Sequence, residues 1–144
     1  MSAFTVAKTC IRSLVQLKKA LINLGWKENQ IELHSTKQAL KGYQNDTREQ
    51  KAELIIRRQF VGGSSNDIGF AMQADGTVQA LISEYDKNAR GLHGPYNTKF
   101  LDSVTQQYAF EMLKDQCTSN GFFLESATTD KNGFIQIDAS NPHI

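Results

Sequence analysis

Residues 67–85 read DIGFAMQADGTVQALISEY, an apolar run on each side of the dipeptide Asp75-Gly76. Asp-Gly tolerates the positive φ angles that a tight two-residue turn requires. This stretch therefore predicts a hairpin whose antiparallel strands cover residues 67–73 and 77–85.

A second turn signal, Asn132-Gly133, predicts another hairpin between residues 122–128 and 134–139. The segment 52–60 is rich in branched side chains, which predicts a strand that is buried on both faces or nearly so. Shorter strands are expected at residues 4–8, near 31–33 and at 40–43, the last followed by a polar loop to residue 50.

Two stretches predict amphipathic helices. The leucines of residues 13–24 recur at spacings of three, four and three, which places them on one helical stripe. Ser13 can cap the first amides, and Gly25 can take the left-handed turn that ends this helix. The second helix is expected over residues 98–119, ended by Gly121. Its apolar stripe consists of Phe100, Leu101, Val104, Tyr108, Met112 and Leu113.

These elements follow the order β-α-β-β-β-β-α-β-β. The predicted fold class is α+β, a two-layer sandwich in which two main helices pack on one face of a mainly antiparallel sheet. Residues 1–139 are expected to form a single α+β domain, because no repeat, linker or low-complexity segment interrupts them. Residues 140–144 are expected to be a C-terminal tail.

Composition is that of an ordinary globular protein. Of the 144 residues, 40% are hydrophobic and 22% are charged, close to the average for folded domains. The formal net charge is +1, from 16 basic and 15 acidic residues, whereas dedicated duplex-binding proteins are usually far more basic. No apolar run approaches the roughly 18 residues of a membrane span, and the first residues lack the pattern of a secretory signal. No membrane partner is therefore expected.

The two cysteines, Cys10 and Cys117, share no metal-ligand spacing and lie in different predicted elements. They are interpreted as reduced thiols, and a disulfide is not indicated. A soluble, intracellular protein is therefore expected. Neither a metal site nor a cofactor is predicted.

Several short motifs keep one order along nearly the whole chain. They are Ser2-Ala3-Phe4, Lys8-Thr9, Leu24-Gly25, Gly42-Tyr43, Asp67-Ile68-Gly69-Phe70, Thr105-Gln106-Gln107-Tyr108-Ala109 and Gly121-Phe122. Together they resemble the hypothetical chloroplast reading frame thirty-five family, a plastid and cyanobacterial domain of unknown function. The resemblance implies the fold and a place in the cytoplasm or plastid stroma, but no reaction. The chain departs from the family at Ala3, where the family usually has histidine, and in a longer loop at 88–96.

The candidate ligand or interaction site consists of Asp67, Glu84, Asp86, Arg90 and His93. Asp67 opens a strand after a Gly-rich turn, and the others lie at a strand end and its loop, where functional sites often occur. A carboxylate beside His93 could perform acid–base chemistry. For Asp67 a structural interpretation is favoured, in which its carboxylate caps the turn and Gly69 lets a neighbouring side chain approach the backbone.

Arg57 and Arg58 form a candidate basic surface. They are expected to end a buried strand, where alternation would point them to opposite faces. One of them is expected to pair with a carboxylate such as Glu84. The near-zero net charge favours the interpretation of both as ordinary solvated charges.

Three functions are weighed, in this order. The first is a non-catalytic protein-interaction or accessory module with an unidentified protein partner, which would use the polar segment 35–50 and the loop 87–96. The second is a small-ligand-binding protein or enzyme with its site near Asp67, Glu84 and His93. The third is a weak nucleic-acid binder that uses the arginine pair, with an affinity that falls as salt rises. A nucleic-acid partner is the least expected of these.

Overall fold

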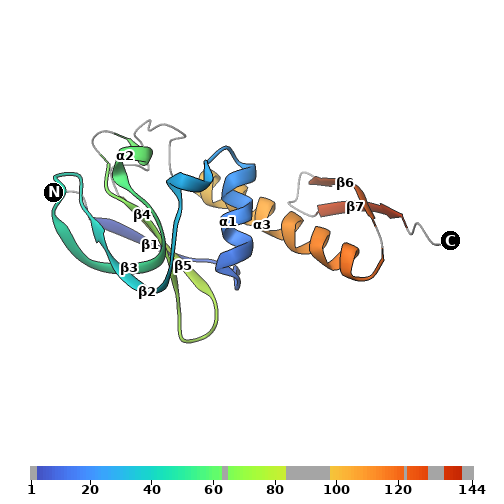
Figure 1. Ribbon diagram of the computed structural model, residues 1–144, viewed down its shortest axis with the longest axis horizontal. Coiled ribbons are helices and arrows are strands. Elements are labelled where there is room, and N and C mark those ends of the chain that lie inside the picture. The colour runs from blue at the N-terminus through green and yellow to red at the C-terminus, as the bar shows by residue number, and fades with distance from the viewer. Residues whose placement is uncertain (1–2, 63–64, 84–97, 122, 130–134, 141–144) are drawn as a thin grey trace.

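The computed structural model describes residues 3–62, 65–83, 98–121, 123–129 and 135–140. It has the predicted α+β class, with helices beside an antiparallel sheet of five strands (Figure 1). The spatial order of this sheet is β1-β5-β4-β3-β2, and every neighbouring pair runs antiparallel. Its strands are β1 (Phe4–Lys8), β2 (Glu32–Lys41), β3 (Thr47–Ile56), β4 (Ile68–Met72) and β5 (Val78–Ser83).

The turn chemistry of the central hairpin is confirmed. β4 and β5 are joined by the Asp75-Gly76 turn, in which Gly76 has a φ of +84°. The Gln73 amide donates to the Thr77 carbonyl oxygen at 2.8 Å and so closes the turn. A side chain would resist this φ angle, so glycine lets the two strands meet at this point.

The predicted helices are also present, as α1 (Leu14–Asn23) and α3 (Thr98–Ser119). Ser13 caps α1, since its hydroxyl accepts a hydrogen bond from the Gln16 amide at 3.2 Å. Gly25, just beyond α1, has the positive φ that the sequence predicted. Two residues of the expected stripes lie at the surface, because Leu24 is 36% exposed and Met112 is 41% exposed.

The two helices cover one face of the sheet and seal its larger core. Tyr108 of α3 links them, because its hydroxyl accepts hydrogen bonds from the backbone amides of Arg12 at 3.1 Å and Ser13 at 3.2 Å. The fully or almost fully buried members of this core from α1, α3 and the strands are Leu17, Ala20, Leu21, Leu54, Ile56, Ile68, Phe70, Val78, Ala80, Ile82, Val104 and Tyr108.

A smaller apolar cluster lies in the concave part of the sheet, formed by Leu40, Ala52, Ile55, Ala71 and Leu81. Gly69 is essential to its packing. A Cβ atom at this position would lie 2.9 Å from Leu40 Cδ1 and 3.0 Å from Ala52 Cβ, closer than packed carbon atoms normally approach. The prediction that Gly69 admits a neighbouring side chain is therefore confirmed, and that side chain is Leu40.

The segment between residues 34 and 60 differs from its prediction. Residues 47–50 of the expected polar loop belong to β3, and β2 is a ten-residue strand in place of two short ones. The predicted strand over 52–60 stops at Ile56, and Arg58–Val61 forms a short helix, α2. Polar side chains misled the prediction because most of this hairpin lies at the surface, where strands need no apolar alternation.

The last hairpin forms a sheet of its own. β6 (Phe123–Thr129) pairs with β7 (Ile135–Ser140) antiparallel, as the sequence predicted. The prediction of one sheet did not anticipate that this pair stands at the far end of α3, away from β1–β5 (Figure 1). The turn Asn132-Gly133 lies outside the described residues. Within the described ranges, no helix is both long and apolar enough to cross a bilayer.

Candidate functional site

Asp67 is fully buried, and its carboxylate binds two backbone amides and one arginine side chain. Its carboxylate accepts hydrogen bonds from the Lys41 amide at 2.6 Å, the Arg58 amide at 2.7 Å and Arg57 Nη1 at 2.9 Å. Its own amide donates to the Lys41 carbonyl oxygen at 2.9 Å. Asp67 thus ties the end of β2 to the chain between α2 and β4, which supports the structural interpretation of this residue.

Arg57 continues this network to the start of β2. Its guanidinium binds Glu32 through two hydrogen bonds, from Nε at 2.9 Å and from Nη2 at 3.1 Å. Nη1 also donates to the Ala39 carbonyl oxygen at 3.2 Å. His34 Nε2 lies 2.8 Å from the Glu32 carboxylate and completes the cluster.

These contacts shift the pKa of two groups in the cluster. Hydrogen bonding to Glu32 raises the pKa of Arg57; partial burial opposes this, and Asp67 adds to it. For Glu32, partial burial acts to raise the pKa, but the hydrogen bonds and charges of Arg57 and His34 outweigh it and lower the pKa. Both side chains therefore stay ionised as a paired unit near neutral pH.

The candidate basic surface is turned partly inward. Arg57 forms the ion pairs described above with Glu32 and Asp67. Glu84, the partner that the sequence suggested, lies outside the described residues. Arg58 Nη2 donates to the Tyr43 carbonyl oxygen at 2.6 Å. Both arginines therefore fasten the β2–β3 hairpin to the rest of the sheet, which leaves less of their charge for an external ligand.

The other four predicted site residues, Glu84, Asp86, Arg90 and His93, lie outside the described residues. The site they would form with Asp67 therefore stays a prediction. Cys10 and Cys117 are both free, as expected.

A different feature, the outer side of β1, presents backbone groups for binding. β1 is an edge strand that pairs with β5 in unbroken register, from Phe4 opposite Ser83 to Lys8 opposite Gln79. The Thr9 amide donates to the Val78 carbonyl oxygen. Because neighbours in an antiparallel strand alternate between the partner and the open side, the amides and carbonyls of Phe4, Val6 and Lys8 point outward.

β2, the opposite edge, lacks this regularity. Its register with β3 stops at Leu33 opposite Leu54 and resumes only at Gln38 opposite Ala52. Four β2 residues thus stand opposite one residue of β3, which is a large bulge. Bulges twist an edge away from potential partner strands and are a common protection against edge pairing.

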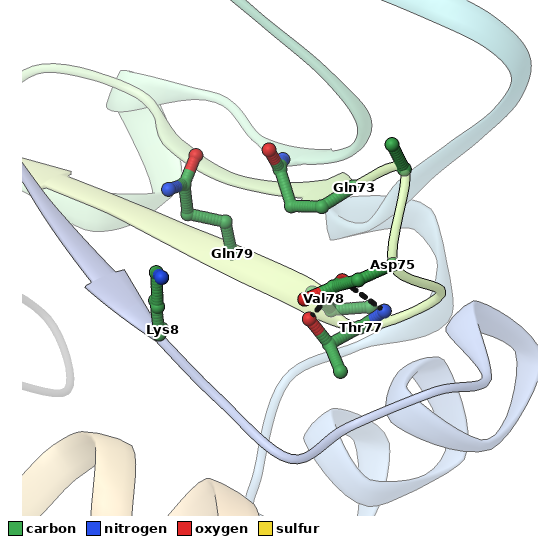
Figure 2. Close-up of a pocket in the computed structure, with 7 residues that line it drawn as sticks. Lys8, Gln73, Asp75, Thr77, Val78 and Gln79 are labelled. Atoms are coloured by element: carbon green, nitrogen blue, oxygen red, sulfur yellow. Dashed lines mark hydrogen bonds between the residues drawn. The ribbon is translucent and has the colours of Figure 1, made fainter.

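A shallow pocket of ≈ 290 Å³ lies beside β1, at the end of the central hairpin (Figure 2). Its lining comes from the end of β1, the β4–β5 turn and the first residues of β5: Lys8, Gln73, Ala74, Asp75, Thr77, Val78 and Gln79. Lys8 lies opposite Gln79, and Gln79 lies opposite Ala71. Side chains paired across a sheet share a face, so Lys8, Gln79 and Gln73 stand together on the side away from the helices, as Figure 2 shows.

Asp75, at the tip of this hairpin, is held by Thr77. Its Oδ1 accepts from the Thr77 hydroxyl at 2.6 Å and from the Thr77 amide at 2.9 Å. These hydrogen bonds lower the pKa of Asp75, and the positive charges of Lys8 and Arg12 add to the effect. The pocket therefore has a positive end at β1 and a negative end at the turn.

A family model described as "Protein of unknown function (DUF1257)" matches residues 20–137. The chain belongs to this family. The match begins within α1 and covers α3, the central hairpin and most of the C-terminal hairpin. It includes the Asp67 network and most of the pocket, whereas β1 with Lys8 precedes it. No curated protein and no solved structure matches the chain.

In this DUF1257 member, sequence reasoning found Asp67 and Arg57 but missed the edge of β1 and the pocket beside it. The signal was present, since Phe4, Val6 and Lys8 alternate in the first predicted strand. The sequence does not show which strand of a sheet becomes an edge, because strand order depends on long-range pairing.

Proposed function

We propose that this domain is a non-catalytic protein-interaction module that binds an extended segment of a partner protein along the outer edge of β1. The observation that carries the proposal is the exposure of Val6, which is 52% accessible in the middle of a regular edge strand. An exposed, regular edge offers backbone donors and acceptors that another chain can pair with.

The contrast with β2 supports the choice of edge. β2 is bulged between Leu33 and Gln38, and its end is held by Asp67 and Arg57. The polar segment 35–50, which the sequence suggested as a binding surface, forms the tip and flanks of this hairpin. Part of its backbone is bound within the fold, for example where the Tyr43 amide donates to Asn66 Oδ1 at 2.8 Å.

The Asp67 network argues against placing a reaction at that residue. A base or ligand needs a lone pair directed at its substrate, whereas the two carboxylate oxygens of Asp67 already accept three hydrogen bonds inside the fold. Removal of this carboxylate would leave its three partly buried donors without this acceptor. The small-ligand and enzyme interpretation therefore receives less support than the interaction module.

The experiment is a selection of displayed random peptides on the full chain, followed by binding of the enriched peptides to edge variants. Val6→Pro removes an outward-facing amide while leaving the ladder with β5, because a proline is tolerated where the N–H faces away from the sheet. It should abolish binding. Val6→Lys, which keeps the amide but places a charge on the edge, should weaken it.

The matched control is Thr36→Pro, a proline in the bulge of the other edge, which should bind the peptides like the original chain. Circular dichroism melting of every variant checks that the fold is kept. Failure to enrich any peptide would overturn the proposal. Binding by Val6→Pro and Val6→Lys as tight as by the original chain would overturn it too.

We further propose a reducing, aqueous setting, the cytoplasm or a plastid stroma, for this module. Two free cysteines support this, with Cys10 exposed at the surface, where an oxidising compartment would favour its modification. The resemblance to the plastid and cyanobacterial family supports it too. Thiol labelling in intact cells of the source organism should find both cysteines reduced, and an oxidised Cys10 would contradict this setting.

A further inference from the structure

The pocket beside β1 lies where it can contact a side chain of a segment paired with that strand. Lys8 belongs to β1 itself and lines the pocket. Val6, two residues earlier, projects from the same face, because alternate residues of a strand share a face. An added strand would therefore present its side chains first to Val6 and Lys8.

Lys8 gives this end of the pocket a positive charge, which acts on Asp75 without forming an ion pair with it. Within the described ranges, no carboxylate lies within ion-pair distance of Lys8. Asp75 lies at the other end of the pocket, at the hairpin turn, where Thr77 holds it through two hydrogen bonds. Gln73 uses its Nε2 on the Ala71 carbonyl oxygen at 3.1 Å, while Gln79 stands beside Lys8 as a second potential donor (Figure 2).

The size of the pocket suits one side chain. A volume of ≈ 290 Å³ falls at the bottom of the range of small-molecule sites, which is roughly 300–1,000 Å³. A carboxylate that entered from the β1 side would meet the Lys8 ammonium, which has three donor hydrogens. The entering carboxylate would bind at the β1 end of the pocket, whereas Asp75 lies at the turn end.

We infer that the segment paired with β1 is acidic and alternating, with an Asp or Glu in the pocket beside Lys8 and an apolar residue two positions away over Val6. This inference rests on the proposed function and specifies its partner. Backbone pairing supplies affinity that any extended chain can share, and the two side chains select among sequences.

A second copy of this chain fits the surface less well. β1 reads FTVAK and contains no acidic residue. If two copies paired antiparallel about Val6, Lys8 of each would face Phe4 of the other and would meet no carboxylate. The charge complementarity therefore favours a foreign acidic segment.

The test compares the sequences that the displayed library yields on three versions of the full chain. On the original chain, the enriched peptides should carry Asp or Glu at one fixed position and an apolar residue two positions away. On Lys8→Glu, the fixed acidic position should change to Lys or Arg. Lys37→Glu, an equivalent charge reversal at an exposed lysine of the β2 edge, should keep the acidic preference.

Affinity gives a second readout. Lys8→Ala should weaken binding of an enriched acidic peptide by about two- to fivefold at low salt, the range of exposed ion pairs. The loss should shrink as salt rises, because screening weakens the pair in the original chain. The same peptide with Gln in place of its acid should bind both versions alike.

The outcomes separate this inference from the proposed function. Enriched peptides that require the Val6 amide but show no acidic position, or no change on Lys8→Glu, would overturn the inference and leave strand pairing intact. Absence of any enriched peptide would overturn both. A concentration-dependent dimer that Val6→Pro abolishes would identify a second copy as the occupant and overturn the acidic segment.

Discussion

The two edges of the five-stranded sheet are built in opposite ways. β2 is long and bulged, and Arg57 and Asp67 bind its Ala39 carbonyl oxygen and its Lys41 amide near its end. β1 is short and regular, with an exposed Val6 and outward-facing backbone groups. The difference shows how one sheet can carry a bulged edge and a regular edge, and we propose that the regular edge serves recognition.

The largest effect is expected from a change that removes the interactions holding the β2 edge. Asp67→Ala removes the acceptor of three hydrogen bonds and leaves Arg57 and two partly buried amides without this partner. This should cost about 3 kcal/mol of unfolding free energy. Denaturant unfolding measures this loss. Hydrogen exchange should show the loss of protection concentrated in β2 and β3.

Asp46→Ala serves as the control for this change, since Asp46 also pairs with an arginine, Arg48, but near the tip of the β2–β3 hairpin. It should lower stability much less. Equal losses for the two variants would show that the Asp67 network does not hold the β2 edge.

A smaller effect is expected in the apolar cluster that contains Leu40 and Ala52. Gly69→Ala would place a Cβ atom against Leu40 and Ala52, and overpacking of this kind typically costs about 1–3 kcal/mol. In a Leu40→Ala background the same change should cost less, because the clashing side chain is gone. A double-mutant cycle with no coupling would contradict the packing of Leu40 over Gly69.

Proline substitutions at two neighbouring residues of β1 test which backbone amides face outward, and this test needs no bound peptide. Ala7→Pro removes an amide that faces β5 and should cost roughly 1–2 kcal/mol. Val6→Pro removes an amide that faces outward and should cost less. Thermal melting ranks the two variants, and the reverse order would mean that the outward face of β1 has been assigned to the wrong residues.

The smallest effect concerns pH. The pKa of Glu32 is lower in the folded state than its ordinary value, so its ionised form stabilises the fold. This contribution is present above the unfolded pKa of about 4.3 and is lost as the pH falls through the lower folded pKa. Because Glu32 is partly exposed, the loss should stay below about 1 kcal/mol.

Glu32→Gln should remove this part of the acid sensitivity. Unfolding free energies of the original chain and the variant, measured between neutral and acidic pH, should converge as the pH falls. A constant difference across this range would show that the ionisation of Glu32 does not stabilise the fold.

The sequence predicted the parts of the fold that depend on local chemistry. Gly25 and Gly76 sit at the turns that their backbone freedom requires, and Ser13 caps its helix. The structural role of Asp67 and the close approach at Gly69 also followed from a turn residue and a glycine within a strand. The full burial of Asp67 was not predicted. The polar strand β2 escaped prediction because its exposed side chains lack apolar alternation. The edge position of β1 and the separate sheet of β6 and β7 escaped because strand order depends on distant pairing.

The pairing of β1 with β5 has a consequence for synthesis. Thr9 and Val78, which are hydrogen-bonded where this pair begins, stand 69 positions apart in the chain. The ribosome releases the first strand long before its neighbour exists, and contacts of such long range slow folding. During translation, the nascent N-terminal strand must therefore wait with both of its edges open, a state in which a chaperone or a partner could capture it before the sheet closes.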